Sequence, residues 1–280
     1  MTNFTEKDSS HIIQKITNSI GNLDKEPFEH IVIDDFLPEK LFKTISNNFP
    51  DSESDIWDFY NYDRQIKRAS NKVIKFPSPA RELFYFLNSY EFISPLSDLL
   101  KIKRITSDPY FYGAGLHKID SGGKLDLHAD FSQMSHLNLF RRINLIIYFN
   151  SNWKSEYGGN LELWSKDLSR CEKSVSPIGN RAVIFRTDTS SYHGHPKPLN
   201  TPKEVSRKSM AVYFYTIEKD EHTFGLDTRW RNKNKTDMTF KYRMRRSIAK
   251  SLWKTSNKIE NISKKITRSF EKMINKIDVV

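Results

Sequence analysis

Apolar residues recur at helical spacing in the first third of the chain. They stand three and four positions apart over residues 9–20, 38–49 and 80–100, and Pro95 falls inside the last pattern. This spacing places them on one face of a helix, so three helical segments are predicted, the last of them interrupted at Pro95. Residues 30–34 form a short apolar run ahead of the second helix and predict a strand.

Strand-like patterns begin after Pro109. The segments there are short and rich in β-branched and aromatic residues, and turn signals such as Gly158-Gly159 separate them. Six such segments with no helix between them predict an antiparallel sandwich or jelly roll. The predicted strands are Tyr110–Ile119, Leu125–Asp130, Ile143–Asn150, Asn160–Trp164, Arg181–Phe185 and Ser209–Thr216.

These elements predict a mainly β (α+β) protein with one folded body and a tail, which the length of 280 residues allows. Residues 1–105 are expected to be helical support integrated with the core, residues 106–222 the β core, and residues 223–280 a basic tail. Residues 51–77 are polar with interspersed aromatic residues and are predicted to be irregular.

Charge is concentrated in the tail. The formal net charge of the chain is +11. Residues 229–280 contain 16 Lys and Arg against 4 Asp and Glu, whereas residues 1–228 contain 29 bases against 30 acids. The protein is therefore a nearly neutral body with a basic tail, and the pI near 9.5 describes only their sum.

Within the tail, apolar residues again recur at steps of three and four, with Lys and Arg between them. The pattern predicts a C-terminal amphipathic helix of about 30 residues. Such a helix can pack on the body, pair with a partner helix, or lie on an anionic surface or membrane, and nucleic acid is not favoured. The apolar positions are Ile248, Leu252, Ile259, Ile262, Ile266, Phe270, Met273 and Ile277.

Cysteine usage and the lack of targeting signals favour a cytoplasmic location. Cys171 is the single cysteine, which excludes an intramolecular disulfide framework. The N-terminus has no basic segment followed by an apolar one, so a secretory signal is not predicted. A run of about 18 apolar residues, the length of a transmembrane segment, occurs nowhere in the sequence.

The candidate chemistry begins with His128 and Asp130, which stand two positions apart in a predicted strand. Side chains two apart on a strand point the same way, so an imidazole and a carboxylate converge on one point. Two protein ligands hold a divalent ion weakly, and a third is needed from another strand. The histidines that could provide it are His117, His136, His193, His195 and His222.

Two further residues stand at the ends of apolar strands. His193 follows the strand at residues 181–185 and lies 65 positions after His128, which leaves room for intervening strands to bring the two together. Arg207 opens the apolar strand that ends at Thr216. An inward-facing arginine there requires an anionic partner, because burying it alone costs several kcal/mol. A ligand carboxylate held by two parallel hydrogen bonds would satisfy the guanidinium.

The His-x-Asp pair, the distal His193 and Arg207 together resemble the site of the iron(II)- and 2-oxoglutarate-dependent dioxygenases, in particular the prolyl 4-hydroxylase-like branch. The likeness runs from about Tyr110 to Thr216 and, more weakly, over residues 27–50. It implies a double-stranded β-helix core, a cupin-like jelly roll. Further matching stretches are RRINLIIYFNSNW, the segment Tyr157–Leu163 and the strand NRAVIF ahead of His193.

The resemblance implies a role for each residue. His128, Asp130 and His193 would bind iron(II) as a facial triad, which leaves three positions of an octahedral ion open for 2-oxoglutarate and dioxygen. Arg207 would hold the distal carboxylate of 2-oxoglutarate, helped by the phenol of Tyr148. The implied cofactors are iron(II), with 2-oxoglutarate and O2 as co-substrates and ascorbate as a candidate reductant.

Three other residues are candidates for supporting roles. His195 lies two positions after His193 and is the alternative distal ligand; it could instead orient a ligand through a hydrogen bond. His117 stands on the strand before the site and could face the substrate. Asp126 shares the strand face of His128 and is a candidate for orienting it or for a purely structural role.

The resemblance therefore predicts a 2-oxoglutarate-dependent dioxygenase, an oxidoreductase that hydroxylates a C–H bond and releases succinate and CO2. It favours a peptidyl proline as the substrate. Two alternatives stay open. One is a related oxygenase that acts on a small molecule or a glycan precursor. The other, from a different class, is a non-catalytic binding module with a degenerate metal site and a basic interaction tail.

Overall fold

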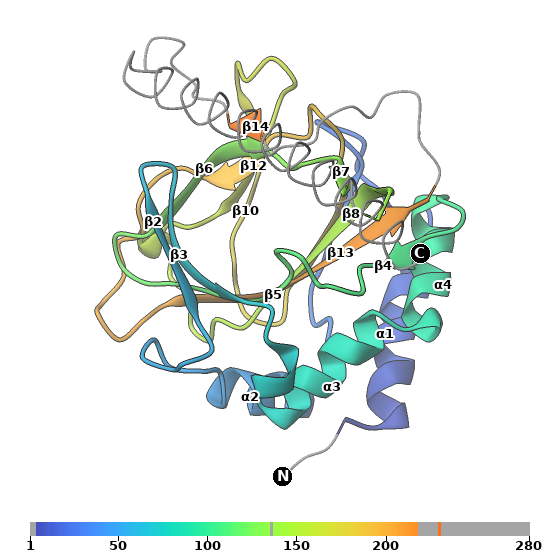
Figure 1. Ribbon diagram of the computed structural model, residues 1–280, viewed down its shortest axis with the longest axis horizontal. Coiled ribbons are helices and arrows are strands. Elements are labelled where there is room, and N and C mark those ends of the chain that lie inside the picture. Colours follow the sequence, from blue (N-terminus) through green and yellow to red (C-terminus); the bar gives the residue numbers. More distant parts are fainter. Residues whose placement is uncertain (1–3, 135–136, 218–228, 231–280) are drawn as a thin grey trace, which may run out of the picture. The chain divides into compact units, whose positions relative to one another are not determined.

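Antiparallel strands dominate the structure, a computed structural model that describes residues 4–134, 137–217 and 229–230 (Figure 1). Strands far apart in the sequence are neighbours in one continuous sheet, which rolls up into the predicted jelly roll. In order across the sheet the strands are β1 (His30–Ile33), β11 (Ala182–Arg186), β8 (Leu139–Tyr148), β13 (Arg207–Thr216), β5 (Gly115–Ile119), β3 (Gln65–Ser70), β6 (Lys124–Ala129), β12 (His193–His195), β9 (Leu161–Trp164) and β10 (Cys171–Val175).

Four further strands pair beside this path. They are β2 (Asp58–Tyr62) with β3, β4 (Thr106–Ser107) with β13, β7 (Gln133–Met134) with β8, and β14 (Arg229–Trp230) with β6. The mainly β fold predicted from the sequence is thus confirmed. Strands β1, β2 and β3 come from the first 105 residues, so this segment supplies strands as well as helices to the barrel.

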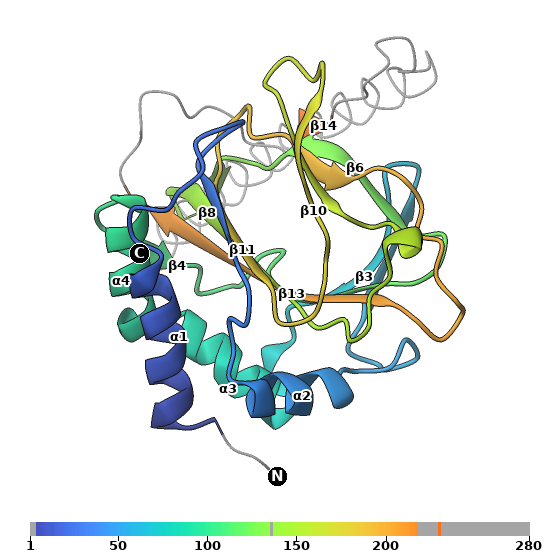
Figure 2. The same cartoon turned by 180° about the vertical axis from the view of Figure 1, so that it is seen from behind.

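Helices cover the outer face of the β11–β8–β13 part of the sheet (Figures 1 and 2). Apolar residues of the helices, such as Ile16, Leu83 and Leu96, form one core with that face. Thr5 begins the first helix with a capping box that Asp8 closes. The helices are α1 (Glu6–Asn18), α2 (Glu39–Asn47), α3 (Ser78–Leu87) and α4 (Tyr90–Leu100), with single 3-10 turns η1 (Val73–Lys75) and η2 (Ser155–Tyr157).

Strand alternation gives β8 two different faces. Ile143, Leu145 and Ile147 are fully buried against the helices. Tyr148 instead packs with apolar residues of β9 and β11, and Asn144 bonds to Asp130. Because successive side chains of a strand point to opposite faces, one face builds the core and the other lines the inside of the barrel, where it can carry chemistry.

The helical segment at residues 80–100 breaks at a place that the sequence pattern did not indicate. The predicted interruption at Pro95 is wrong: α3 ends at Leu87, and α4 continues through Pro95. The Asn88 side chain donates to the Phe84 carbonyl (2.8 Å), which satisfies an acceptor at the end of α3. Pro95 removes one amide donor from α4, and tertiary packing of the flanking leucines outweighs that loss.

The prediction that residues 51–77 are irregular is also wrong. Strands β2 and β3 form a hairpin whose register pairs Tyr62 with Gln65 across a two-residue turn. Strand β3 then lies between β5 and β6 and completes that side of the barrel. Both strands are largely polar and only partly buried, so their composition resembles that of a loop.

Asn180 ties the segment before α2 to the turn before β11. Its side chain accepts a hydrogen bond from the Leu37 amide (2.8 Å) and donates one to the Leu37 carbonyl (2.9 Å). It is 4% exposed, and its backbone lies in the left-handed region, with φ at 62°. Asparagine tolerates this conformation better than most residues.

Asn180→Ala is expected to lower the free energy of unfolding by about 2 kcal/mol, because two buried backbone groups lose their partners and a left-handed alanine is strained. Urea-induced unfolding would measure the loss. Asn180→Gly is the matched control: it removes the same hydrogen bonds but relieves the backbone, and should be destabilised less. An Asn180→Ala protein as stable as the wild type would contradict the assigned role of the side chain.

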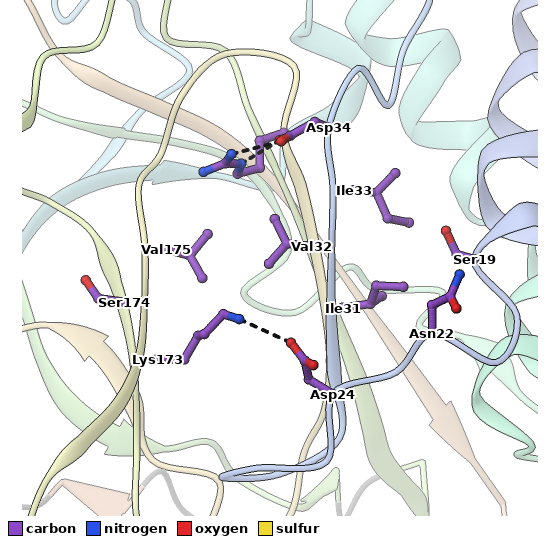
Figure 3. Close-up of a pocket in the computed structure, with 11 residues that line it drawn as sticks. Ser19, Asn22, Asp24, Ile31, Val32, Ile33, Asp34, Lys173, Ser174 and Val175 are labelled. Atoms are coloured by element: carbon purple, nitrogen blue, oxygen red, sulfur yellow. Dashed lines mark hydrogen bonds and ion pairs between the residues drawn. The ribbon is translucent and has the colours of Figure 1, made fainter.

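A hollow of about 570 Å³ lies where β1 and β10, the two ends of the sheet, face each other (Figure 3). Lys173 of β10 contacts Asp24 (3.2 Å) beside it, and Arg181 contacts Asp34 (2.6 Å). The hydrogen bond from Arg181 holds the pKa of Asp34 below its usual value. The lining contains no member of the predicted site, so the hollow is separate from the candidate chemistry.

Several predictions fall on residues that the structure does not describe. The amphipathic helix from Ile248, the start of the tail at residue 223, and the candidate ligands His136 and His222 all lie outside the described residues. Among the residues that are described, none of the helices combines the length and the apolar character needed to cross a bilayer.

Candidate metal centre

His128, Asp130 and His193 come together inside the barrel. His128 on β6 and His193 on β12 are direct partners in the antiparallel register, and Asp130 follows β6. The Nε2 atoms of His128 and His193 each lie 3.6 Å from an oxygen of Asp130. The three ligand atoms all lie within 4.8 Å of one another, a spacing that one metal ion can bridge.

Backbone carbonyls fix the protonation of both imidazoles. The Nδ1 atom of His128 lies 2.8 Å from the Asp126 carbonyl, and that of His193 lies 2.9 Å from the Ser191 carbonyl. A carbonyl oxygen can only accept, so each Nδ1 donates its proton. Each Nε2 is therefore the ring nitrogen that faces Asp130, and it is the nitrogen that a metal ion would bind.

Charge states at the site also suit a metal ligand set. Burial, together with the nearby His128, lowers the pKa of His193 to about 4, so its ring is neutral at neutral pH. Burial by itself would raise the pKa of Asp130, but the Arg141 charge and a hydrogen bond with His128 hold it well below its usual value. Two imidazoles and one carboxylate form the donor set typical of non-haem iron(II).

Asn144 and Arg141 of β8 hold the Asp130 carboxylate from behind. Both contact Asp130 Oδ2: the Asn144 amide donates at 2.8 Å, and an Arg141 nitrogen lies 3.0 Å away. Arg141 also donates twice to Asn144 Oδ1, at 2.7 and 2.9 Å, and its guanidinium lies 3.4 Å from the Tyr213 ring centroid. Asp130 Oδ1 takes no part in these bonds, which leaves it available to a metal ion.

Asn144→Ala is expected to weaken iron(II) binding about 10- to 100-fold, because groups that orient a ligand carry an effect of this size. Titration of the metal-free protein with iron(II) under anaerobic conditions would measure it. Asn150→Ala is a matched control, because Asn150 is equally buried but bonds to Pro177 and Lys208 and touches no ligand. If both variants bound iron(II) equally well, Asn144 would have no orienting role.

Arg207 forms a buried cationic clamp with Tyr148. One terminal nitrogen donates to the Tyr148 hydroxyl (3.1 Å), and Nε donates to the Gly159 carbonyl (2.8 Å). Burial lowers the pKa of Arg207 and raises that of Tyr148. Within the described part of the chain, no carboxylate lies within ion-pair distance of this guanidinium, which is 5% exposed. The clamp therefore fits a carboxylate that comes from a ligand.

Gly159 makes room for this clamp. A Cβ atom at this position would lie 3.1 Å from Arg207 Cδ and 2.5 Å from Leu199 Cδ2. Its φ of 70° also lies in the left-handed region, which favours glycine. The Gly-Gly turn seen in the sequence thus lets the backbone approach the guanidinium and accept its hydrogen bond.

Of the supporting candidates, His195 does not join the three-residue ligand cluster. It is 3% exposed, and neither ring nitrogen has a hydrogen-bond partner among the described residues. His117 lies near Lys67 and Arg207, and its Nε2 donates to the Gly113 carbonyl (3.2 Å). Burial and the Lys67 charge lower the pKa of His117 to about 3.

Asp126 contacts His128 through its backbone and not through its carboxylate. Its carbonyl accepts the His128 Nδ1 proton, while its carboxylate pairs with Lys124 at 2.9 Å. The orienting role considered for the Asp126 side chain therefore belongs to its main chain, which any residue at this position could supply.

The sequence reasoning missed Asn144, Arg141 and Lys67. Asn144 stands four positions before Tyr148 on the same strand, so strand alternation could have indicated that it faces inward. Lys67 lies on β3, in the segment wrongly predicted to be irregular. Burial lowers the pKa of Lys67 to about 8, an effect that the Asp130 charge partly offsets.

A known family matches the part of the chain that carries these residues. The family model of the 2OG-Fe(II) oxygenase superfamily matches residues 114–215. The matched segment covers the strands from β5 to β13, and it contains every residue predicted to bind the metal or the co-substrate.

Two solved structures resemble the fold. One is a prolyl hydroxylase from Trichoplax adhaerens in complex with a peptide fragment of the hypoxia inducible factor oxygen degradation domain; it has a TM-score of 0.52 and 15% identity, over 74% of this chain and 90% of that chain. The other is a prolyl-4-hydroxylase from Pseudomonas putida, with a TM-score of 0.51 and 13% identity, over 73% of this chain and 98% of that chain. At such low identity the likeness establishes a shared fold.

Proposed function

We propose that this chain, which belongs to the 2OG-Fe(II) oxygenase superfamily, hydroxylates a peptidyl proline with iron(II), 2-oxoglutarate and dioxygen. The observation that carries the proposal is the pairing of two features inside one barrel. One is a cluster of two imidazoles and a carboxylate whose ligand atoms lie within 4.8 Å of one another. The other is the buried Arg207–Tyr148 clamp, which lacks a protein carboxylate.

The residues of the chain would divide the work as follows. His128, Asp130 and His193 would hold iron(II), and Arg207 with Tyr148 would hold the distal carboxylate of 2-oxoglutarate. When bound, iron(II) and 2-oxoglutarate supply the oxidation, in which 2-oxoglutarate becomes succinate and CO2 while a substrate C–H bond is hydroxylated. The protein itself contributes positioning and charge.

Positioning begins with protons that are already in place. The carbonyls of Asp126 and Ser191 accept the Nδ1 proton of each imidazole, so each Nε2 faces the position that the metal would occupy. Arg141 and Asn144 keep Asp130 charged and oriented. Phe185 packs against the His193 ring at 4.8 Å between centroids and keeps water from that side of the centre.

Proline as the substrate rests on the two similar structures, both of which are prolyl hydroxylases. Aromatic side chains near the site suit such a ring. Tyr60 and Tyr62 of β2 contact each other at 6.3 Å between ring centroids, and Tyr112 contacts Phe131 at 5.8 Å. Tyr62 and Tyr112 are strongly exposed, so they can receive an apolar ring from solution.

The proposal is tested by incubating the purified protein with iron(II), 2-oxoglutarate, ascorbate and a library of proline-containing peptides. Mass spectrometry should find peptides that gain one oxygen atom, and succinate should form in proportion. A parallel panel of free amino acids and sugars tests small molecules. Succinate coupled only to a small molecule would overturn the choice of proline, and no succinate with any substrate would overturn the oxygenase.

Two further parts of the proposal concern the cellular setting. We keep the cytoplasm as the proposed compartment, because iron(II) and the single Cys171 both suit a reducing environment. For the basic tail we keep the proposal of a contact with an anionic surface, a membrane or a partner helix. Its charge of 16 bases against 4 acids over residues 229–280 supports the anionic partner.

A further inference from the structure

Lys67 points into the barrel, which follows from the strand register. Ala69 pairs with His117, His117 pairs with Ser209, and Ser209 pairs with Tyr148 across four neighbouring strands. Directly opposed residues of antiparallel strands share one face of the sheet, and Tyr148 faces inward. Lys67 lies two positions from Ala69 on β3, so it shares this inner face.

The charged groups that act on Lys67 belong to the metal centre and to the co-substrate clamp. Asp130 is the charged group that affects it most, followed by Arg141 and then Arg207. Its Nζ atom also lies 5.9 Å from the ring centroid of Tyr60, on the outer strand of the hairpin. Lys67 therefore lies beside the half-buried Tyr60 and within electrostatic reach of Asp130.

Lys67 has no ion-pair partner among the described residues, unlike two other basic residues of the same hairpin region. Its neighbour Arg68 pairs with Asp120, and Lys72 pairs with Asp58 at 2.9 Å. Asp130 is the acid whose charge affects Lys67 most, but it already pairs with Arg141 and accepts a hydrogen bond from Asn144. A partly buried ammonium without a counter-ion is costly, which favours an anionic partner from outside the chain.

Charge balance leads to the same conclusion. Among the described residues, the groups that act on one another here are the cations Lys67, Arg141 and Arg207 and the carboxylate of Asp130. The cations exceed the carboxylate by two charges. Iron(II) and the doubly negative 2-oxoglutarate cancel each other when both bind, so this surplus persists in the loaded site and attracts a negatively charged substrate.

We propose that Lys67 binds a carboxylate of the substrate beside the metal centre, and that this enzyme therefore selects an acidic substrate. The inference rests on the proposed function and adds the chemical class of the substrate. A carboxylate suits a single ammonium flanked by tyrosine rings, whereas phosphate sites ordinarily combine backbone amides or an arginine fork. The carboxylate can belong to an acidic residue next to the proline or to a free amino acid.

The test measures binding, so it does not depend on turnover. The protein is loaded with Mn(II) and N-oxalylglycine, an unreactive analogue of 2-oxoglutarate, and titrated calorimetrically with matched acid and amide probes. One set comprises capped tetrapeptides with Glu or Gln before or after a proline, and the other is L-proline against L-prolinamide. The first set tests a side-chain carboxylate of a peptide, and the second tests the carboxylate of a free amino acid.

In the wild type, at least one acid probe is expected to bind about tenfold more tightly than its amide, the effect of one charge-assisted hydrogen bond. Lys67→Met should reduce that preference to less than about twofold, while Lys67→Arg should keep most of it. Lys43→Met is the matched control, because Lys43 is an exposed lysine on α2, and it should behave as the wild type. Thermal unfolding verifies that each variant is folded.

Three outcomes would overturn the inference. The first is the absence of a preference for the acid in every pair, including no binding at all, and the second is a preference that survives Lys67→Met. The third is a loss of N-oxalylglycine affinity as large as the loss for the acid probe, which would assign Lys67 to the co-substrate. Failure of the proposed function is distinguishable, because the wild type would then form no succinate with any substrate.

Discussion

His193→Ala is expected to abolish iron(II)-dependent succinate formation and to weaken iron(II) binding by at least about 100-fold, more than the loss of an orienting group causes. The variant keeps His128 and Asp130, but two protein ligands hold a divalent ion weakly. The Nε2 of His193 lies 3.6 Å from Asp130 and comes from a different strand from the other two ligands. Anaerobic titration with iron(II) and a succinate assay would measure both losses.

His11→Ala and His195→Ala serve as controls for this experiment. His11 is half-buried on α1 and does not belong to the ligand cluster, so its loss should leave iron(II) binding unchanged. His195 is buried two positions from His193 and does not belong to the ligand cluster, so its loss should spare the metal. If His195→Ala released iron(II) while His193→Ala retained it, the distal ligand would be His195 and the assigned triad would be incorrect.

Arg207→Ala is expected to raise the 2-oxoglutarate concentration needed for half-maximal succinate formation about 150- to 4,000-fold, because removing one partner of a buried ion pair costs about 3–5 kcal/mol. Iron(II) binding should stay close to that of the wild type, since Arg207 bonds to Tyr148 and Gly159 and to none of the metal ligands. Initial rates at graded 2-oxoglutarate concentrations would measure the shift.

Two related variants separate charge from geometry in the clamp. Arg207→Lys keeps the charge but loses the planar fork, so it should recover only part of the affinity. Arg181→Ala removes an arginine that pairs with Asp34 beside the separate hollow, and it should leave 2-oxoglutarate binding unchanged. Equal loss of iron(II) and 2-oxoglutarate in Arg207→Ala would contradict the role assigned to Arg207.

The parts of the site that local spacing specifies could be predicted from the sequence. A His and an Asp two positions apart on a strand converge whatever the rest of the fold does. The structure brings them together with His193, because β12 lies beside β6 in the rolled sheet. Arg207 was found because a charged residue that opens an apolar strand needs a partner, and the structure places it against Tyr148.

The parts that depend on pairing between distant segments could not be predicted. Asn144 on β8 donates a hydrogen bond to Asp130, which follows β6. No local sequence pattern encodes a contact between segments this far apart in the fold. Lys67 belongs to a hairpin whose polar strands are stabilised by pairing with β5 and β6 and not by an apolar face of their own. Sequence periodicity detects a strand by the alternation of apolar residues on its buried face. It therefore fails for a strand that has few apolar residues on either face.

The visible absorption spectrum reports whether iron(II) and 2-oxoglutarate bind together at the His128–Asp130–His193 centre. A 2-oxoglutarate molecule chelated to iron(II) gives a charge-transfer band that neither component gives alone. We expect this band to appear when 2-oxoglutarate is added anaerobically to the iron(II)-loaded protein. It should be absent in His193→Ala and should require far more 2-oxoglutarate in Arg207→Ala. A wild-type protein that binds both components without the band, or an unchanged band in His193→Ala, would contradict the account.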